Sequence, residues 1–449
     1  MMSSAKPPRR ILLRTIAVII ALLAVVAALI AGVLAPYYLS TDIAQTSLLT
    51  LTALVTFAVI VWLGLRLSAA LWRTNRPARL AAMTSGVLTV AFLIALYLLI
   101  LRPTPPRYTD VIPADHAKSW RLSTGSVISY QEFLPPAGMA VKPDPIVFIH
   151  GGPGARFAPF DSEAYGSFAA DGFRVYLYDQ AGSGASALLP HIRDYSIARS
   201  VEDLEAIRLQ LHAEQMILIG HSWGSMLAAH YMAKYPTRVS KVVFNSPGAL
   251  AHYEGASADM SRTDLGPQVT SLPPLRLLAG LLLMEKNPDA AEQLLPQREA
   301  QEMTGPFLME VTRYGKTLVC KGDSAKLPQV IAGIKDQPDN PGFNGYVSDR
   351  YLEEASTARA DPRAALRGNR TPAILLYGEC NYLAWQGSVD YRNTFANLKI
   401  FYIPKAGHYI QFEQPELMGK VIRNFLLDQA DAIPPYTRDA DPRSPINQT

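Results

Sequence analysis

The sequence predicts an α/β fold, with a mainly parallel sheet flanked by helices, preceded by three transmembrane helices. Three observations support this. Beyond residue 119, short apolar runs rich in β-branched residues alternate with segments whose apolar residues recur at helical spacing. Before residue 102, three uncharged runs are each long enough to cross a bilayer. Between 250 and 367, a stretch rich in Leu, Glu, Arg and Pro interrupts the alternation and indicates an inserted helical cap.

The three uncharged runs lie at 15–34, 47–65 and 80–101. A helix rises about 1.5 Å per residue, so about 20 apolar residues match the hydrocarbon core of a bilayer. A cleaved signal peptide is the alternative for the first run, but its apolar stretch is too long for one. The lipid bilayer is therefore an expected partner.

The charges between these runs predict their orientation. Basic residues precede the first run and separate the second from the third, whereas the loop between the first two has no Lys or Arg. Basic loops stay on the cytoplasmic side. The residues concerned are Lys6, Arg9, Arg10, Arg66, Arg73, Arg76 and Arg79. Three spans then place the C-terminal domain outside the cytoplasm.

The remaining boundaries follow from composition. A Pro-rich stretch at 102–118 indicates a stiff linker, and the polar, Pro-rich residues 431–449 indicate a disordered tail. The α/β core is expected at 119–249 and 368–430, on either side of the cap at 250–367. Its strand candidates are 146–150, 174–178, 216–220, 241–245, 373–377 and 400–403.

Composition also bounds the partners. The net charge is only +4, and no Lys/Arg block is interleaved with aromatic residues, so nucleic acid is not an expected partner. The two cysteines, Cys320 and Cys380, form no C-x-x-C motif and no cluster with histidines, so no metal site is expected. Two separate buried thiols are favoured over a disulfide, because sequence spacing alone does not bring the two together.

The strand candidate 216–220 runs directly into Gly220-His221-Ser222-Trp223-Gly224, which a helical pattern follows. G-x-S-x-G between a strand and a helix is the pattern of a nucleophile elbow, a turn so tight that flanking side chains would collide. Ser222 is therefore the predicted nucleophile.

A second Gly-rich loop, His150-Gly151-Gly152-Pro153-Gly154, follows another buried strand. Acyl transfer needs backbone N–H groups that face the developing oxyanion, each worth roughly 3 to 4 kcal/mol. The N–H groups of Trp223 and of Gly152 or Gly151 are the predicted oxyanion hole.

His408 follows the last strand candidate, in Pro404-Lys405-Ala406-Gly407-His408. It comes last in the order nucleophile, acid, histidine that this arrangement of strands requires. His408 is therefore the predicted general base.

Four motifs together carry a family resemblance: HGGPG, the DQAGSG stretch at 179–184, GHSWGS and the late AGH. Between about Trp120 and Gln429 the chain resembles the proline iminopeptidase-like α/β-hydrolases, a serine peptidase family of the α/β-hydrolase superfamily. The resemblance implies aminopeptidase-type cleavage of small peptides or amides through Ser222 and His408, with no metal and no organic cofactor.

The acid position departs from that family's pattern. The family places an aspartate after the penultimate strand, in a Gly-Glu-x-Asp context, whereas this chain reads Gly378-Glu379-Cys380-Asn381. Asn381 orients an imidazole without stabilising its positive charge, and such a replacement cost about four orders of magnitude in a serine protease. Either Asn381 completes a slower triad, or Glu379 acts as the acid.

Three functions remain open at this point. The leading one is a membrane-anchored serine hydrolase, an aminopeptidase or amidase that forms an acyl-enzyme with a small or short-peptide substrate. A carboxylesterase or lipase-like hydrolase needs the same groups. A catalytically silent binding or sensing protein is the third, because Asn381 replaces the usual acid. No cap carboxylate is singled out as an amine ligand; those available are Glu285, Glu292, Glu302, Glu310, Glu353 and Glu354.

Overall fold

The computed structural model describes residues 8–72, 77–106, 118–250, 273–311, 318–320, 343–355 and 361–443. The chain divides into two compact units, which are described one at a time. The first comprises 1–105 together with 273–296, and the second comprises 106–272 together with 297–449. Most of the predicted linker and large parts of the predicted cap lie outside the described residues.

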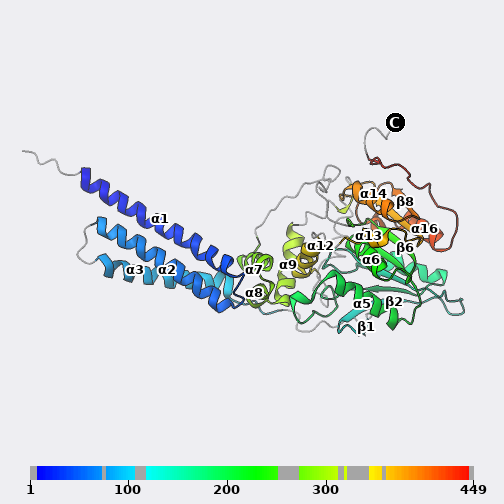
Figure 1. Cartoon of the computed structure of the whole chain (residues 1–449), viewed down its shortest axis with the longest axis horizontal. Helices are drawn as coiled ribbons and strands as arrows, with labels where there is room; N and C mark the ends of the chain where they lie inside the picture. Colours follow the sequence, from blue (N-terminus) through cyan, green and yellow to red (C-terminus); the bar gives the residue numbers. More distant parts are fainter. Residues whose placement is uncertain are drawn as a thin grey trace, which may run out of the picture. The chain divides into compact units, whose positions relative to one another are not determined.

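The first unit contains three long apolar helices: α1 (Pro8–Leu39), α2 (Thr46–Leu71) and α3 (Pro77–Leu96), which η1 (Tyr97–Leu101) extends as a π-helix. The stretches Ile11–Leu39, Thr46–Leu71 and Ala78–Leu101 are long and apolar enough to cross a membrane, as the sequence predicts. Figure 1 shows α1 and α2 side by side in blue. Gly64 permits this approach, because a Cβ there would lie 2.1 Å from that of Ala24.

Two further helices belong to this first unit: α7 (Leu275–Lys286) and α8 (Pro288–Leu294). The side chain of Asn287 caps α8 by accepting hydrogen bonds from the N–H groups of Asp289 and Ala290. The sequence assigns both helices to the cap, so the predicted cap is divided between the two units. Their amphipathic pattern predicted helices but not the unit against which each one packs.

The second unit is built on an eight-stranded sheet in the order β1-β2-β4-β3-β5-β6-β7-β8, in which β2 pairs antiparallel with both β1 and β4 and all other neighbouring strands pair parallel. All six predicted strands are present. β1 and β2 were not predicted: β1 is a short edge strand with one buried residue, and β2 mixes Ser, Gln and Glu with its apolar residues. The strands are β1 (Lys118–Arg121), β2 (Val127–Phe133), β3 (Ile146–Ile149), β4 (Val175–Tyr178), β5 (Met216–His221), β6 (Val239–Asn245), β7 (Ala373–Gly378) and β8 (Leu398–Ile403).

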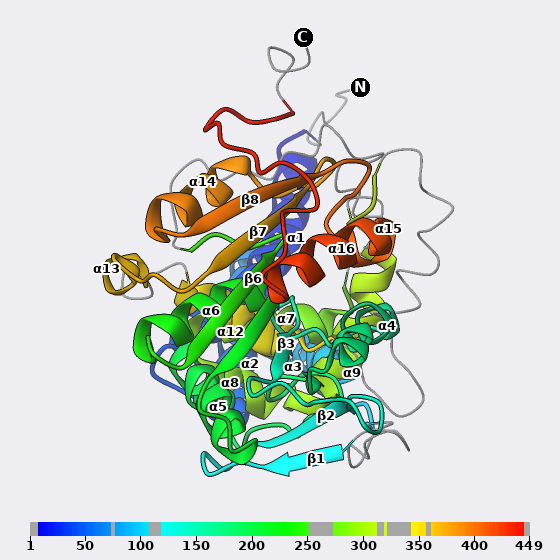
Figure 2. The same cartoon turned by 90° about the vertical axis from the view of Figure 1, so that its right-hand side faces the viewer.

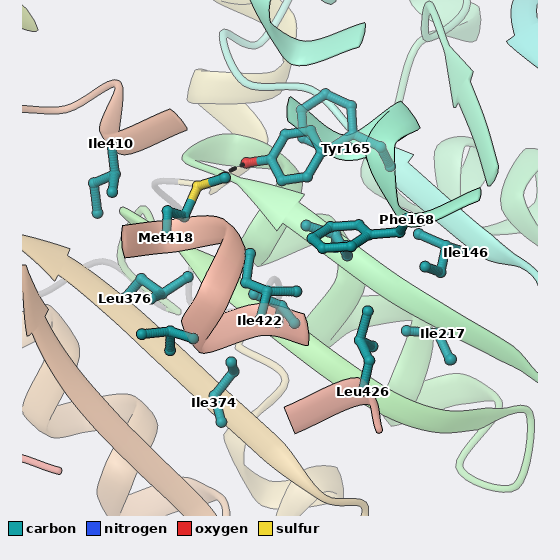
Figure 3. Close-up of a cluster of buried hydrophobic side chains, with 14 of the residues drawn as sticks. Ile146, Tyr165, Phe168, Ile217, Ile374, Leu376, Ile410, Met418, Ile422 and Leu426 are labelled. Carbon is teal, nitrogen blue, oxygen red and sulfur yellow. Dashed lines mark hydrogen bonds between the residues drawn. The ribbon is translucent and has the colours of Figure 1, made fainter. Parts of the chain in front are cut away.

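Helices cover both faces of this sheet (Figure 2). One face packs against α4 (Pro159–Gly166), η2 (Ser167–Asp171) and α16 (Pro415–Leu426), and forms the buried apolar cluster of Figure 3. Alternate residues, such as Ile217 and Ile219 of β5, point into this cluster because side chains in a strand alternate between faces. The helices that contact the sheet or each other elsewhere include α5 (Ile197–Gln210), α6 (Trp223–Lys234) and α14 (Trp385–Thr394).

The remaining described elements of this unit are η3 (Ile192–Asp194), α9 (Gln297–Val311), α12 (Gly345–Ala355), α13 (Arg363–Leu366) and α15 (Ile410–Glu413). The tail differs from the expectation of disorder over 431–443. The indole N–H of Trp385 donates to the carbonyl of Asp439 at 2.8 Å, and the guanidinium of Arg443 donates to the carbonyl of Asn381 at 2.7 Å. These long-range bonds hold a polar segment that has no regular structure of its own.

Candidate active site

Ser222 lies at the turn between β5 and α6, as the nucleophile-elbow pattern predicts. Its backbone has φ 52° and ψ −117°, a conformation that side chains rarely adopt. The N–H of Ser222 donates to the carbonyl of Asn245 at 2.9 Å, and its own carbonyl accepts from the N–H of Gly248 at 3.1 Å. A Cβ on Gly224 would lie 2.0 Å from the carbonyl oxygen of Ile149, so only glycine fits there. Backbone packing therefore holds the turn in its strained shape.

The predicted oxyanion loop lies against this turn. A Cβ on Gly151 would lie 2.9 Å from the Cβ of Ser222, and Gly152 has φ 123°. Trp223 is the first residue of α6, where backbone N–H groups have no partner within the helix. The structure thus brings Gly151 of this loop against the elbow at Ser222, one residue before Trp223.

His150, in the same loop, is a structural residue. Its Nε2 accepts a hydrogen bond from the backbone N–H of Gln180 at 2.9 Å, and its side chain is almost fully buried. Burial lowers the pKa of this imidazole to about 4. A neutral His150 therefore joins the Gly-rich loop to the stretch that begins at Asp179.

His408 lies between β8 and α15, in the position predicted for the base. The backbone N–H of His408 donates to the carbonyl of Leu318 at 3.0 Å. The backbone carbonyl oxygen of His408 lies 3.1 Å from Nε2 of His221. Burial lowers the pKa of His408 well below its ordinary value, and the nearby His221 imidazole lowers it further. The two rings lie 4.9 Å apart between centroids. No hydrogen bond joins His408 to the Ser222 hydroxyl among the described residues, and such contacts commonly tighten when substrate binds.

The structure brings Asn381, rather than Glu379, to His408. Oδ1 of Asn381 lies 3.1 Å from Nδ1 of His408, and the same oxygen accepts a hydrogen bond from the N–H of Leu383 at 3.2 Å. Because that N–H only donates, it fixes which end of the Asn381 amide faces the imidazole. The carboxylate of Glu379 instead accepts from the N–H of Lys405 at 2.8 Å.

The amide orientation selects the tautomer of His408. A hydrogen bond to an acceptor oxygen requires the proton to be on Nδ1, which leaves Nε2 with a lone pair. The aspartate-to-asparagine change in a serine protease lost about four orders of magnitude because it gave the wrong tautomer. Here the amide oxygen favours the tautomer that leaves Nε2 able to accept a proton, and the missing carboxylate charge is what distinguishes this arrangement from an aspartate triad.

Cys320 and Cys380 form a disulfide, so the prediction of two separate thiols is wrong. Their Cα atoms are 5.1 Å apart although 60 positions separate them in the sequence. The carbonyl of Leu318 accepts the N–H of His408, which brings the segment 318–320 beside the loop that holds Asn381. Pairing depends on that approach of two distant segments, which sequence spacing did not indicate.

Two supporting residues were not singled out from the sequence. The buried carboxylate of Glu413 accepts from the N–H of Cys320 at 2.9 Å and from the N–H of Gly407, next to His408. Asn344 is fully buried. Its backbone N–H donates to the carbonyl of Gly154 at 2.7 Å, and its side-chain amide donates to the carbonyl of Gly182 at 2.9 Å. Neither residue belongs to a recognisable motif, so no sequence signal marked either one.

The described cap carboxylates of the second unit make separate contacts. The carboxylate of Glu354 accepts from the N–H of Ile197 at 2.8 Å, that of Glu353 pairs with Arg350, and Glu302 is buried in α9. Glu285 and Glu292 belong to the first unit, and the side chain of Glu310 lies outside the described residues. In the part of the chain that the structure describes, no cluster of three or more His, Cys, Asp or Glu side chains is placed to hold a metal ion.

Comparison with known proteins identifies relatives. The profile of the alpha/beta hydrolase fold family matches residues 144–415. A probable proline iminopeptidase of Streptomyces coelicolor is 30% identical over 321 residues, which cover 67% of this chain and 92% of that protein. The proline iminopeptidase of Heyndrickxia coagulans is 36% identical over 124 residues, so the match spans 41% of that enzyme and 28% of this chain.

Solved structures are similar at lower identity. An esterase from Thermogutta terrifontis is 20% identical, with a TM-score of 0.49 over 70% of this chain and 98% of the esterase. The proline iminopeptidase of Mycobacterium smegmatis is 18% identical, with a TM-score of 0.45 over 70% of this chain and 98% of its own. The family profile and the long match to the Streptomyces protein carry the assignment: the chain belongs to the alpha/beta hydrolase fold family and is a homologue of the proline iminopeptidases.

Proposed function

We propose that the protein is a membrane-anchored serine hydrolase that cleaves small peptides or amides at their amino end through an acyl-enzyme. The single observation that carries the mechanism is the hydrogen bond between Nδ1 of His408 and the oriented amide oxygen of Asn381, at 3.1 Å, next to a nucleophile elbow. The proline iminopeptidase relatives supply the substrate class.

The proposed steps follow acyl-transfer chemistry. Nε2 of His408 takes the proton of the Ser222 hydroxyl as Oγ attacks the carbonyl carbon of the substrate. The N–H groups of Trp223 and of Gly152 or Gly151 stabilise the oxyanion. His408 then gives its proton to the leaving amine, the C–N bond breaks, and water hydrolyses the resulting ester.

The second candidate is a carboxylesterase, because the same nucleophile, base and oxyanion donors act on esters. A panel of aminoacyl-arylamides with short-chain and long-chain acyl esters, tested on the full chain in detergent, separates the two. Faster turnover of the arylamides supports the peptidase, and faster turnover of the esters supports the esterase. Inactivity on every substrate favours the silent binding protein.

A fluorophosphonate probe tests the nucleophile directly. The probe reacts with an activated hydroxyl beside oxyanion donors, so the wild type should be labelled and Ser222→Ala should not. Ser240→Ala, in β6 of the same unit, is the control and should be labelled as the wild type is. Undiminished labelling of Ser222→Ala excludes Ser222 as the nucleophile.

We also propose that the hydrolase domain lies outside the cytoplasm. Two features support this placement: the basic residues of the second loop, and the Cys320–Cys380 disulfide, since disulfides persist in oxidising compartments. Protease added to intact cells should then digest this domain. If the domain is protected until the cells are lysed, it lies in the cytoplasm and the proposed orientation is wrong.

A further inference from the structure

The first unit holds an apolar pocket that the proposed hydrolysis does not use. Its volume is about 370 Å³, and it is lined by residues of α1, α2, η1, α7 and α8, among them Val33, Leu49, Ala53, Ile100, Ala279 and Leu283. Sites for small organic ligands measure roughly 300 to 1,000 Å³. The pocket is therefore large enough for a ligand, and its apolar lining favours a hydrocarbon one.

Polar side chains fasten the helices that form the pocket. The guanidinium of Arg276 in α7 donates to the carbonyl of Ile100 at 2.6 Å, and the amide of Asn287 donates to the carbonyl of Ser40 at 2.8 Å. Both acceptors lie at or near the end of an apolar helix, where carbonyl groups lack partners within the helix. α7 and α8 are thus held in place beside α1 and η1 by specific bonds.

A second pocket, of about 280 Å³, adjoins the first and is more polar. Arg276, Gln293 and Ser47 line it, and it shares Thr46, Thr50, Leu101 and Leu294 with the apolar pocket. The hydroxyl of Thr46 is buried and has no hydrogen-bond partner among the described residues. A buried hydroxyl without a partner costs free energy unless a ligand or water satisfies it. The two pockets together offer an apolar chamber with hydrogen-bond donors at one end.

The surface around these pockets indicates the source of the ligand. Leu275, Leu278 and Leu282 of α7 are 48%, 36% and 45% exposed and recur at the spacing of a single helix face. The three long helices of the same unit also expose their large apolar side chains. Such surfaces are stable in contact with lipid rather than water.

We propose that this site binds a membrane lipid, with one hydrocarbon chain in the apolar pocket and the ester or phosphate oxygens of its head group in the polar pocket. Thr46 and Arg276 donate hydrogen bonds to those oxygens. The proposal is independent of the catalytic mechanism, because every residue it uses lies in the first unit.

Photolabelling of the full chain in lipid nanodiscs tests this site. The nanodiscs contain phosphatidylcholine and a small fraction of a phospholipid with a photoreactive diazirine on one acyl chain, and labelled peptides are identified by mass spectrometry. Labelling of peptides from 275–294 and from α1 or α2 should saturate as the probe fraction rises. Ala279→Trp, which fills the apolar pocket, should reduce this labelling at least fivefold.

Two variants serve as controls. Val87→Trp adds the same side chain at a residue of α3 that is 69% exposed, and should leave the labelling unchanged. Ser222→Ala should label as the wild type does, which separates this result from any failure of the proposed catalysis. Thr46→Val removes the hydroxyl and keeps the shape, so it should weaken labelling severalfold even if Ala279→Trp does not fold. Labelling that rises without saturation, or equally in Ala279→Trp and Val87→Trp, overturns the proposal.

Discussion

The two sides of the candidate active site are held by different means. On the nucleophile side, backbone packs on backbone. The backbone of Ser222 hydrogen-bonds to that of Asn245 and Gly248. Gly224 has no room for a methyl group beside Ile149. On the base side, side chains and a disulfide do this work, because Glu413 and Cys380 hold the loops of His408 and Asn381. The first side is built from two motifs that can be recognised in the sequence, whereas the second depends on partners, such as Glu413 and Cys320, that belong to no motif. Substitutions should therefore affect the two sides differently.

The largest effect is expected from Gly224→Ala. The added methyl group would meet the carbonyl oxygen of Ile149 at 2.0 Å, within a sheet that has little freedom to shift. We expect a loss of more than about 3 kcal/mol in the free energy of unfolding and no fluorophosphonate labelling. Gly419→Ala is the control, since a Cβ at this position in α16 meets nothing within 4 Å and should stabilise that helix slightly. Denaturant unfolding measures both, and equal stabilities would contradict the account.

Removing the disulfide tests the base side. Cys320→Ser combined with Cys380→Ser should lower the free energy of unfolding by about 2 to 4 kcal/mol, since the cross-link limits the unfolded chain. Turnover should fall more than fluorophosphonate labelling does, because the bond holds the loop of Asn381 and not that of Ser222. A reducing agent should have the same effect on the wild type. Unchanged stability after confirmed reduction would show that the bond does not hold this side.

Glu413→Gln tests the same side more gently. The amide keeps the volume of the carboxylate but offers one acceptor oxygen for two N–H donors, those of Cys320 and Gly407. We expect a loss of about 1 to 3 kcal/mol in stability and a lower kcat with little change in KM. Glu416→Gln, at an exposed position in α16, is the matched control. A higher KM with an unchanged kcat would argue against a positioning role for Glu413.

Asn381→Asp addresses the missing charge and should have the smallest effect. A carboxylate stabilises the imidazolium, so turnover should rise about tenfold, equal to about 1.4 kcal/mol. The base works only when it is neutral, and a low His408 pKa keeps the wild type active into acidic pH. The carboxylate raises that pKa, so the acidic limb of the kcat profile should move to higher pH. Asn397→Asp, on the surface, should change neither quantity, and a limb that stays in place would exclude the proposed contact.

This contrast also explains which features could be predicted from the sequence. Ser222, Trp223 and Gly151 belong to motifs whose shape follows from adjacent residues, and the structure places them together. His408 and Asn381 were predicted from their positions after strands, but the choice between Asn381 and Glu379 required the side-chain contacts.

Several of the missed features depend on contacts between distant segments. The Cys320–Cys380 disulfide, the bonds of Glu413 and the order of the tail at Arg443 each join segments far apart in the sequence. Hydrophobic periodicity and composition describe a segment in isolation. They contain no information on which other segment it contacts. The assignment of α7 and α8 to the first unit was missed for the same reason.

The split of the predicted cap has a consequence for proteolytic separation of the hydrolase domain from the three long helices. The chain passes between the two units three times, after residues 105, 272 and 296. In a protein whose soluble domain is joined to its membrane anchor by one linker, a single cut in that linker releases the domain. One cut in the stretch 102–118 would break the covalent link between the three long helices and the hydrolase domain, but the domain would keep α7 and α8, which belong to the same compact unit as those helices. A truncated form that begins after residue 118 would likewise carry α7, with its exposed leucines, into solution.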